Sequence, residues 1–195
     1  MPRKKRTESP VGIYHWINRG YLKQNIFHSR SDFEVFLSLV SEYKDAHGVV
    51  IYHYCLLNNH VHFLIQAPTV SELSVFSHFV KRRYAYYFSK TYHHAGPTFE
   101  KRFVAIPIDG ESYLLECARY IERNPLRAGL AKHPADYEFS SASYYLNRKQ
   151  SLFLTLSPAF LGLSDDPYER TKAYEDYIAQ VRPQEEYASK ALPAI

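Results

Sequence analysis

Cysteine is scarce in this chain, and the two that are present stand far apart. Cys55 and Cys117 each lie among apolar residues, and neither belongs to a CxxC pair. A structural zinc site of the finger type is therefore excluded, because it needs closely spaced cysteine pairs. Two buried thiols fit a protein of the reducing cytoplasm, and we expect a cytoplasmic location.

Long hydrophobic runs are also missing. No apolar stretch approaches the roughly 20 residues that a helix needs to cross a bilayer, so we expect no membrane partner. The first residues, Met1 to Arg6, are basic, but no apolar segment follows them. This pattern argues against a secretory signal, which needs such a segment.

The chain does contain enough apolar surface for a core, and it is rich in tyrosine. Hydrophobic residues make up 46% of the 195 residues, which predicts one domain of ordinary size plus an extension. The net charge is only +4, but 18 tyrosines interleaved with lysine and arginine suit a protein that stacks bases and holds phosphates. For any single tyrosine outside a motif, ordinary packing is the better interpretation.

The pattern of apolar residues predicts four strands and four helices. The strands are expected at residues 12–19, 49–57, 60–67 and 104–108. The helices are expected at residues 31–46, 71–92, 109–124 and 165–180, and the first would begin at a capping box formed by Ser31 and Glu34. This order predicts an α+β fold, in which an antiparallel sheet carries its helices on one face.

The third predicted strand carries two histidines, His60 and His62, separated by Val61. Residues two apart on a strand project to the same side, so the two imidazoles can hold a single metal ion. Val61 and Phe63 would then point into the core. The alternative is that both histidines are ordinary residues of a solvated face. The remaining eight histidines, His15 among them, are interpreted as structural or surface residues.

The third predicted helix carries Tyr120 and Asn124, which share a face because four residues make slightly more than one turn. Tyrosine supplies a hydroxyl nucleophile, and asparagine supplies a carbonyl oxygen that could join two histidines around a metal ion. The alternatives are that Tyr120 is a buried packing residue and that Asn124 only ends the helix before Pro125.

These two motifs together resemble those of the single-tyrosine HUH transposases, which include the REP-associated tyrosine transposases and related insertion-sequence transposases. The resemblance rests on His60-Val61-His62 and on the block from Arg119 to Leu130, which holds Tyr120, Asn124 and Pro125. Residues 16–20 and 139–141 also match the family pattern, and the likeness runs from about Gly12 to Leu146. One departure is Asn58, where the family usually has proline.

The resemblance implies a ferredoxin-like sheet with the HUH motif on a central strand. It also implies a metal-dependent endonuclease and strand transferase that acts on single-stranded or hairpin DNA through a covalent 5′-phosphotyrosine intermediate. The nucleophile would be Tyr120, and the ligands of a Mg²⁺ or Mn²⁺ ion would be His60, His62 and Asn124. Residues 11–150 would form this catalytic domain, between a disordered basic arm (1–10) and a C-terminal extension with one helix (151–195).

Basic residues near these motifs are candidates to hold the DNA backbone: Lys81, Arg82, Arg83, Lys101, Arg102 and Arg127. Two other functions remain open. One is a metal-dependent phosphoesterase in which water attacks, and the other is a protein that binds structured single-stranded DNA without chemistry. The sequence also leaves open whether the protein is a monomer or a homodimer, and whether Tyr120 acts on the histidines of its own chain.

Overall fold

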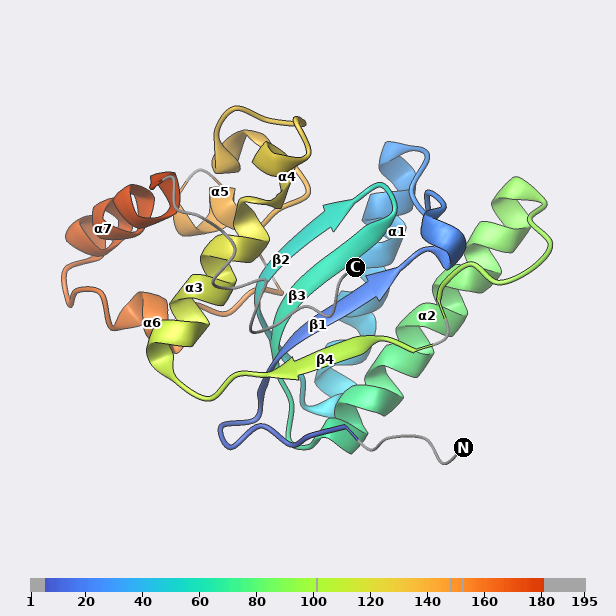
Figure 1. Ribbon diagram of the computed structural model, residues 1–195, viewed down its shortest axis with the longest axis horizontal. Helices are drawn as coiled ribbons and strands as arrows, with labels where there is room; N and C mark the ends of the chain where they lie inside the picture. The colour runs from blue at the N-terminus through green and yellow to red at the C-terminus, as the bar shows by residue number, and fades with distance from the viewer. Residues whose placement is uncertain (1–5, 101, 148, 152, 181–195) are drawn as a thin grey trace.

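The computed structural model describes residues 6–100, 102–147, 149–151 and 153–180, and a four-stranded sheet forms its centre (Figure 1). The strands are β1 (Ile13–Arg19), β2 (Val50–Leu57), β3 (His60–Gln66) and β4 (Val104–Pro107). They lie in the order β2-β3-β1-β4, and every pairing is antiparallel. The predicted α+β fold with an antiparallel sheet is confirmed, and each strand lies within one residue of its predicted bounds.

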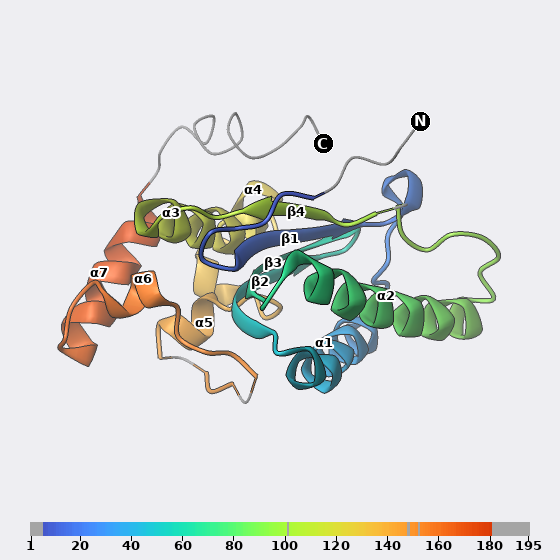
Figure 2. The ribbon, with the colours of Figure 1, turned by 90° about the horizontal axis from the view of Figure 1, so that it is seen from below.

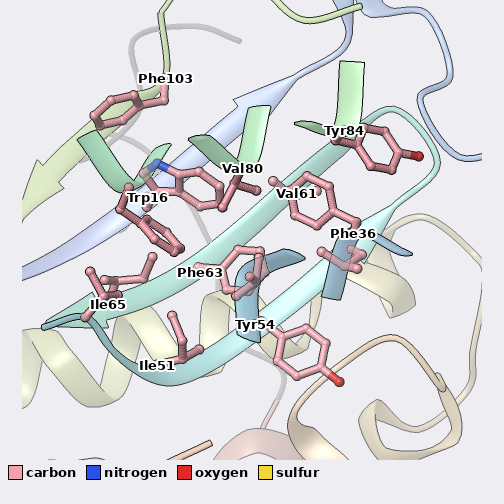
Figure 3. Packing of buried hydrophobic residues seen from close by; sticks show 14 of the residues in the cluster. Trp16, Phe36, Ile51, Tyr54, Val61, Phe63, Ile65, Val80, Tyr84 and Phe103 are labelled. Carbon is pink, nitrogen blue, oxygen red and sulfur yellow. The ribbon is translucent and has the colours of Figure 1, made fainter. Parts of the chain in front are cut away.

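Two long helices cover one face of the sheet and enclose the larger hydrophobic core (Figure 2). α1 (Arg30–Lys44) connects β1 to β2, and α2 (Val70–Tyr92) connects β3 to β4. This βαββαβ order, with β1 and β3 in the middle of the sheet, is the ferredoxin-like arrangement. Because side chains alternate along a strand, Trp16, Val61 and Phe63 point to this face, where they join Phe36 and Val80 (Figure 3).

The third long helix, α3 (Glu111–Glu122), lies on the opposite face, against β2 and β3 (Figure 2). A second core forms there, in which Leu114, Cys117 and Ile121 meet Cys55 and Leu64. The expectation that the helices pack on one face is therefore wrong for α3. The physical reason is that both sets of side chains on the inner strands are buried and apolar enough to need a cover on each side.

The ends of the elements differ from the prediction at two places. Asp32 accepts hydrogen bonds from the backbone N–H groups of His28 and Ser29 at 2.7 and 2.8 Å, so Ser29 precedes α1 and the capping box predicted at Ser31 and Glu34 is wrong. α3 ends two residues early, and a short helix, α4 (Asn124–Arg127), follows it with Pro125 in its first turn.

Both described ends of the chain pack on the domain. The hydroxyl of buried Ser9 donates to the carbonyl of Ile108 at 2.8 Å. The disordered arm predicted for residues 1–10 is thus wrong for residues 6–10, and residues 1–5 lie outside the described residues. Within those residues, no helix is both long and apolar enough to cross a membrane.

The extension contributes two helices where one was predicted, α6 (Pro158–Leu161) and α7 (Pro167–Ala179). They form a third cluster with the short helix α5 (Ala142–Tyr145), in which Tyr145, Phe160, Tyr174 and Ile178 are buried. α6 and α7 also contact α3, so the described part of the extension supports the helix that carries Tyr120. Residues 181–195 lie outside the described part of the chain.

Candidate active site

Two histidines stand side by side on the face of the sheet that α3 covers. His60 and His62 project from the same side of β3, which is an inner strand. Their ring centroids lie 4.9 Å apart, and their planes are nearly perpendicular at 83°. His62 is buried and His60 is half-buried. We call these two residues the histidine pair.

A third imidazole, that of His15 on β1, adjoins the histidine pair. Its Nε2 lies 2.9 Å from Nδ1 of His62, and both residues are buried. β1 pairs with β3 so that Ile17 stands opposite His62, which places His15 one pleat away on the same face. The sequence interpretation missed this residue. The alternation of Ile13, His15 and Ile17 shows their common face, but only the pairing of β1 with β3 brings that face beside His62.

All three imidazoles are uncharged at neutral pH. Burial lowers the pKa of His15 to about 3. Burial also lowers the pKa of His60 to about 4, with a smaller contribution from the charges of Arg19 and Arg127. The pKa of His62 lies well below its ordinary value for the same main reason. The uncharged imidazole is the form that binds a metal ion, so these side chains need to lose no proton to do so.

The spacing of the histidine pair fits a shared metal ion. Nδ1 of His60 lies 2.6 Å from Oδ1 of Asn59, and Nδ1 of His62 contacts His15, so each ring keeps its Nε2 for a ligand. A metal–imidazole bond of about 2.1 Å and a ligand angle of about 90° to 110° place the two ring centroids about 4.5 to 5.2 Å apart. The observed separation of 4.9 Å falls in this range.

The third metal ligand is a separate question. Among the described residues, no group of three His, Cys, Asp or Glu side chains could hold a metal ion. A third ligand from the described residues would therefore be another kind of oxygen, such as that of an amide, a hydroxyl or a backbone carbonyl, and the predicted ligand is Asn124.

α3 brings Tyr120 to the histidine pair within the same chain. The ring of Tyr120 lies edge-on to His62 and to His15, with centroid separations of 5.7 and 5.8 Å. The guanidinium of Arg127 lies over the ring of Tyr120, 4.2 Å from its centroid. The side chain of Tyr120 is buried, since the residue is only 7% exposed. Tyr120 therefore contacts two imidazoles and a guanidinium, which distinguishes it from a tyrosine packed only among aliphatic side chains.

Asn124 lies just beyond the end of α3, and its side chain forms three hydrogen bonds. Its amide nitrogen donates to the carbonyls of Tyr120 and Ile121 at 2.9 and 3.1 Å. Its Oδ1 accepts from Arg127 at 2.9 Å. Asn124 therefore holds the last turn of α3 in this conformation. The Oδ1 atom has a second lone pair, which is left for a metal ion while the hydrogen bond to Arg127 remains.

A buried carboxylate fixes the end of α3. One oxygen of Glu122 lies 2.8 Å from Nδ1 of His53 on β2 and accepts from the hydroxyl of Ser141 at 2.6 Å. The other oxygen accepts from the hydroxyl of Tyr174 on α7 at 2.8 Å. Because Tyr120 is two residues earlier on the same helix, these bonds also fix its position relative to the histidine pair.

The six basic residues predicted to hold DNA do not form one group. Arg127 lies at Tyr120. Lys81, Arg82 and Arg102 line a cavity on the α2 side of the sheet. Arg83 is exposed on α2 and does not line that cavity, and Lys101 lies outside the described residues.

Known proteins share the sequence pattern and the fold of this chain. The sequence model of a family described as "Transposase IS200 like" matches residues 10–124. A solved structure of a REP-associated tyrosine transposase bound to a REP hairpin is similar to this chain with a TM-score of 0.63 and 16% identity, over 82% of this chain and 93% of that one. This likeness supports the ferredoxin-like arrangement.

A second solved structure, of a protein from Deinococcus radiodurans R1 provisionally described as a transposase, has a TM-score of 0.42 and 11% identity, over 77% of this chain and 98% of that one. No curated protein matches the sequence.

Proposed function

Because the chain belongs to the family of IS200-like transposases, we propose that it cuts and rejoins single-stranded DNA through a covalent bond between Tyr120 and a 5′ phosphate. The observation that carries this proposal is the meeting of Tyr120 with the histidine pair inside one chain. The same observation supports a reaction in which Tyr120 acts beside the histidines of its own chain, for which a monomer suffices.

Tyr120 is the nucleophile in this reaction. Its phenolic oxygen attacks the scissile phosphorus, a bond from phosphorus to Tyr120 forms, and the bond from phosphorus to the 3′ oxygen breaks. The phenol gives up its proton and the departing oxygen takes one up from solvent, which leaves a free 3′-OH. A 3′-OH that attacks the phosphotyrosine reverses these steps and joins strands without ATP, because the ester bond is conserved.

The histidine pair would hold a divalent ion, Mg²⁺ or Mn²⁺, which when bound supplies positive charge to a non-bridging oxygen of the scissile phosphate. Mg²⁺ prefers oxygen ligands, so two imidazoles favour Mn²⁺ of these two ions. Asn124 is the proposed third ligand.

Arg127 and His15 support these groups. The guanidinium of Arg127, 4.2 Å from the ring centroid, opposes the negative charge that develops on the phenolic oxygen of Tyr120. His15 holds Nδ1 of His62 and so directs its Nε2 toward the metal position.

The proposed substrate is single-stranded DNA that contains a hairpin. The support is the fold shared with a REP-associated tyrosine transposase that was solved bound to a REP hairpin. Basic side chains on both faces of the sheet would hold its backbone: Lys81, Arg82, Arg83, Arg102 and Arg127. Lys101, outside the described residues, is a sixth candidate.

One experiment tests the reaction. The protein is incubated with a labelled single-stranded hairpin oligonucleotide and Mn²⁺, and the products are separated on a denaturing gel. We expect a labelled protein–DNA adduct with the wild type and with Tyr113→Phe, a matched change on the same helix. We expect no adduct with Tyr120→Phe.

The same gel, together with fluorescence anisotropy as a measure of binding, separates the alternatives. Continued cleavage by Tyr120→Phe would assign the attack to water and make the protein a phosphoesterase. If His60→Ala and the wild type bind the oligonucleotide equally and neither cleaves it, the protein is a DNA-binding protein without chemistry.

A further inference from the structure

A cavity of about 430 Å³ opens between α2 and four residues that follow it, Phe99, Glu100, Arg102 and Phe103, with Arg6 at its side. Its volume falls in the range of ligand sites, roughly 300 to 1,000 Å³. It lies on the face of the sheet that α1 and α2 cover, because Phe99, Phe103 and α2 all belong to that core. The charged and titratable residues that line it are Arg6, His78, Lys81, Arg82, Glu100 and Arg102. We call it the basic cavity.

The cations of the basic cavity are held in place by backbone and aromatic groups. The ammonium of Lys81 donates to the carbonyl of Glu100 at 3.1 Å and lies 5.3 Å from the centroid of the Phe99 ring. The guanidinium of Arg6 donates to the backbone carbonyl of Phe103 at 3.3 Å and lies 3.7 Å from the centroid of the Phe103 ring. These contacts fix two positive charges at the cavity and neutralise neither, since a carbonyl and a ring carry no net charge.

Burial, and after it the proximity of like charges, lowers the pKa of two cations at the basic cavity. Burial, and then the charge of Arg6, lower the pKa of Lys81 to about 8, although the carboxylate of Glu100 acts in the opposite direction. Burial and the charge of Arg102 lower the pKa of Arg6. An anion among these groups would relieve the repulsion, and charge-assisted hydrogen bonds to phosphate are among the strong ones.

A buried hydroxyl also lines the basic cavity. Ser77 of α2 has no exposed surface, and its Oγ finds no hydrogen-bond partner within the described part of the chain. A buried polar atom without a partner costs about 1 to 3 kcal/mol, and an oxygen of a bound phosphate could accept from this hydroxyl.

The basic cavity is continuous with a surface that leads toward the histidine pair. A neighbouring hollow of about 350 Å³ is lined by Tyr21 and Leu22 and shares Glu100 and Arg102 with the basic cavity. Tyr21 follows Arg19 by two residues, and Arg19 is the partner of His60 in the sheet. Leu22 is 79% exposed. One strand of nucleic acid could therefore follow this surface from His60, at the beginning of β3, to the basic cavity.

We propose that the basic cavity binds a backbone phosphate of the single-stranded DNA segment that adjoins the scissile phosphate. Lys81, Arg6 and Arg102 supply the positive charge, and Ser77 supplies a neutral donor. This inference rests on the proposed function, since it takes DNA as the substrate. It adds that the strand contacts both faces of the sheet, with Tyr120 on the α3 face and this phosphate on the α2 face.

The test measures the affinity of the full chain for a labelled single-stranded oligonucleotide by fluorescence anisotropy at several salt concentrations. The variants are Lys81→Gln and Arg6→Gln, and the control is Lys90→Gln, an exposed lysine of the same helix that lies over Tyr86 outside the cavity. We expect each cavity variant to bind about tenfold more weakly, because it cannot form the charge-assisted hydrogen bond to the phosphate. We also expect the slope of log K against log salt to fall by about 0.7 for each phosphate that the variant no longer neutralises. The control should match the wild type.

A scan with single methylphosphonate linkages, which remove one phosphate charge at a time, locates the bound phosphate. In the wild type one linkage should weaken binding at least about tenfold, and in Lys81→Gln the same linkage should have a smaller effect, because only Arg6 and Arg102 are left to bind that phosphate. If Lys81→Gln binds the oligonucleotide as tightly as Lys90→Gln does, the proposal is overturned.

Calorimetry with inorganic phosphate distinguishes the other source of the anion. A loss of affinity for inorganic phosphate in Lys81→Gln, with unchanged affinity for the oligonucleotide, would assign the cavity to a small free anion and overturn the DNA assignment. The adduct gel is independent of this site. If the wild type forms the adduct but Lys81→Gln and Lys90→Gln bind the oligonucleotide equally tightly, the cavity proposal fails and the proposed reaction stands. A failure of the chemistry removes the adduct and leaves the binding differences.

Discussion

Removing the imidazole of His15 should weaken metal binding at the histidine pair. For Nε2 of His62 to bind a metal ion, Nδ1 of His62 must carry the proton of the ring. This N–H then donates a hydrogen bond to Nε2 of His15, 2.9 Å away. His15→Leu keeps an apolar side chain of similar size in the core but cannot accept this hydrogen bond. His15→Gln offers a carbonyl oxygen as acceptor in its place.

The size of the effect follows from burial. Both residues are at most 1% exposed, so water cannot replace the missing acceptor. Leaving one buried N–H without a partner costs about 1 to 3 kcal/mol, and each 1.4 kcal/mol is about a factor of ten in affinity. We therefore expect the dissociation constant for Mn²⁺ to rise about tenfold to a hundredfold in His15→Leu, and less than about threefold in His15→Gln.

The assay is a titration of the protein with Mn²⁺, in which the paramagnetic resonance signal of the free ion gives the bound fraction. His47→Leu is the matched control, because His47 stacks on Phe79 on the other face of the sheet. Urea unfolding without metal shows whether each variant remains folded. If His15→Leu is folded and binds Mn²⁺ as tightly as the wild type, the hydrogen bond does not position His62. Equal weakening in the Leu and Gln variants would mean that shape matters and the acceptor does not.

Three further outcomes are expected. In Glu122→Gln, one amide oxygen replaces the two carboxylate oxygens that contact His53, Ser141 and Tyr174. The free energy of unfolding, measured in urea, should fall by about 3 kcal/mol. An unchanged unfolding midpoint would contradict a structural role of Glu122. Oligonucleotide affinity should fall as the pH rises above about 8, because Lys81 then loses the charge that a phosphate binds; in Lys81→Arg this fall should disappear. Arg127→Gln should slow adduct formation about tenfold to a hundredfold at saturating DNA in rapid-quench experiments, and an unchanged rate would remove Arg127 from the chemistry.

The sequence predicts the strands and the long helices well because their signals are local. The hairpin between β2 and β3 shows this best, since two apolar runs stop at Asn58 and Asn59, which tolerate turn conformations. The juxtaposition of Tyr120 with the histidine pair is not local, and only the resemblance to a family implies it. α3 on the second face is a further non-local fact, which the near-continuous apolar character of β2 and β3 indicated only in retrospect.

The parts that the sequence could not predict depend on which side chains meet across elements. His15 reads as one more core histidine until β1 is placed beside β3. The four-residue spacing of Tyr120 and Asn124 predicts a metal ligand at Asn124. The hydrogen bond from Arg127 to Oδ1 of Asn124 could not be predicted, because it depends on the turn of α4. The capping residue of α1 differs from the prediction because Asp32 also accepts from the hydroxyls of Tyr87 and Tyr92 on α2, which no local pattern shows.

The chain has a single tryptophan, Trp16, buried under α2 with its ring 6.3 Å from that of Phe103 (Figure 3). All indole emission from this protein therefore arises at one known point in the interior. The same Phe103 ring also contacts the guanidinium of Arg6, which lines the basic cavity. Trp16 is thus an optical reporter that needs no added label. The intensity of its emission should follow occupation of the basic cavity, and the wavelength of its emission should follow loss of the fold.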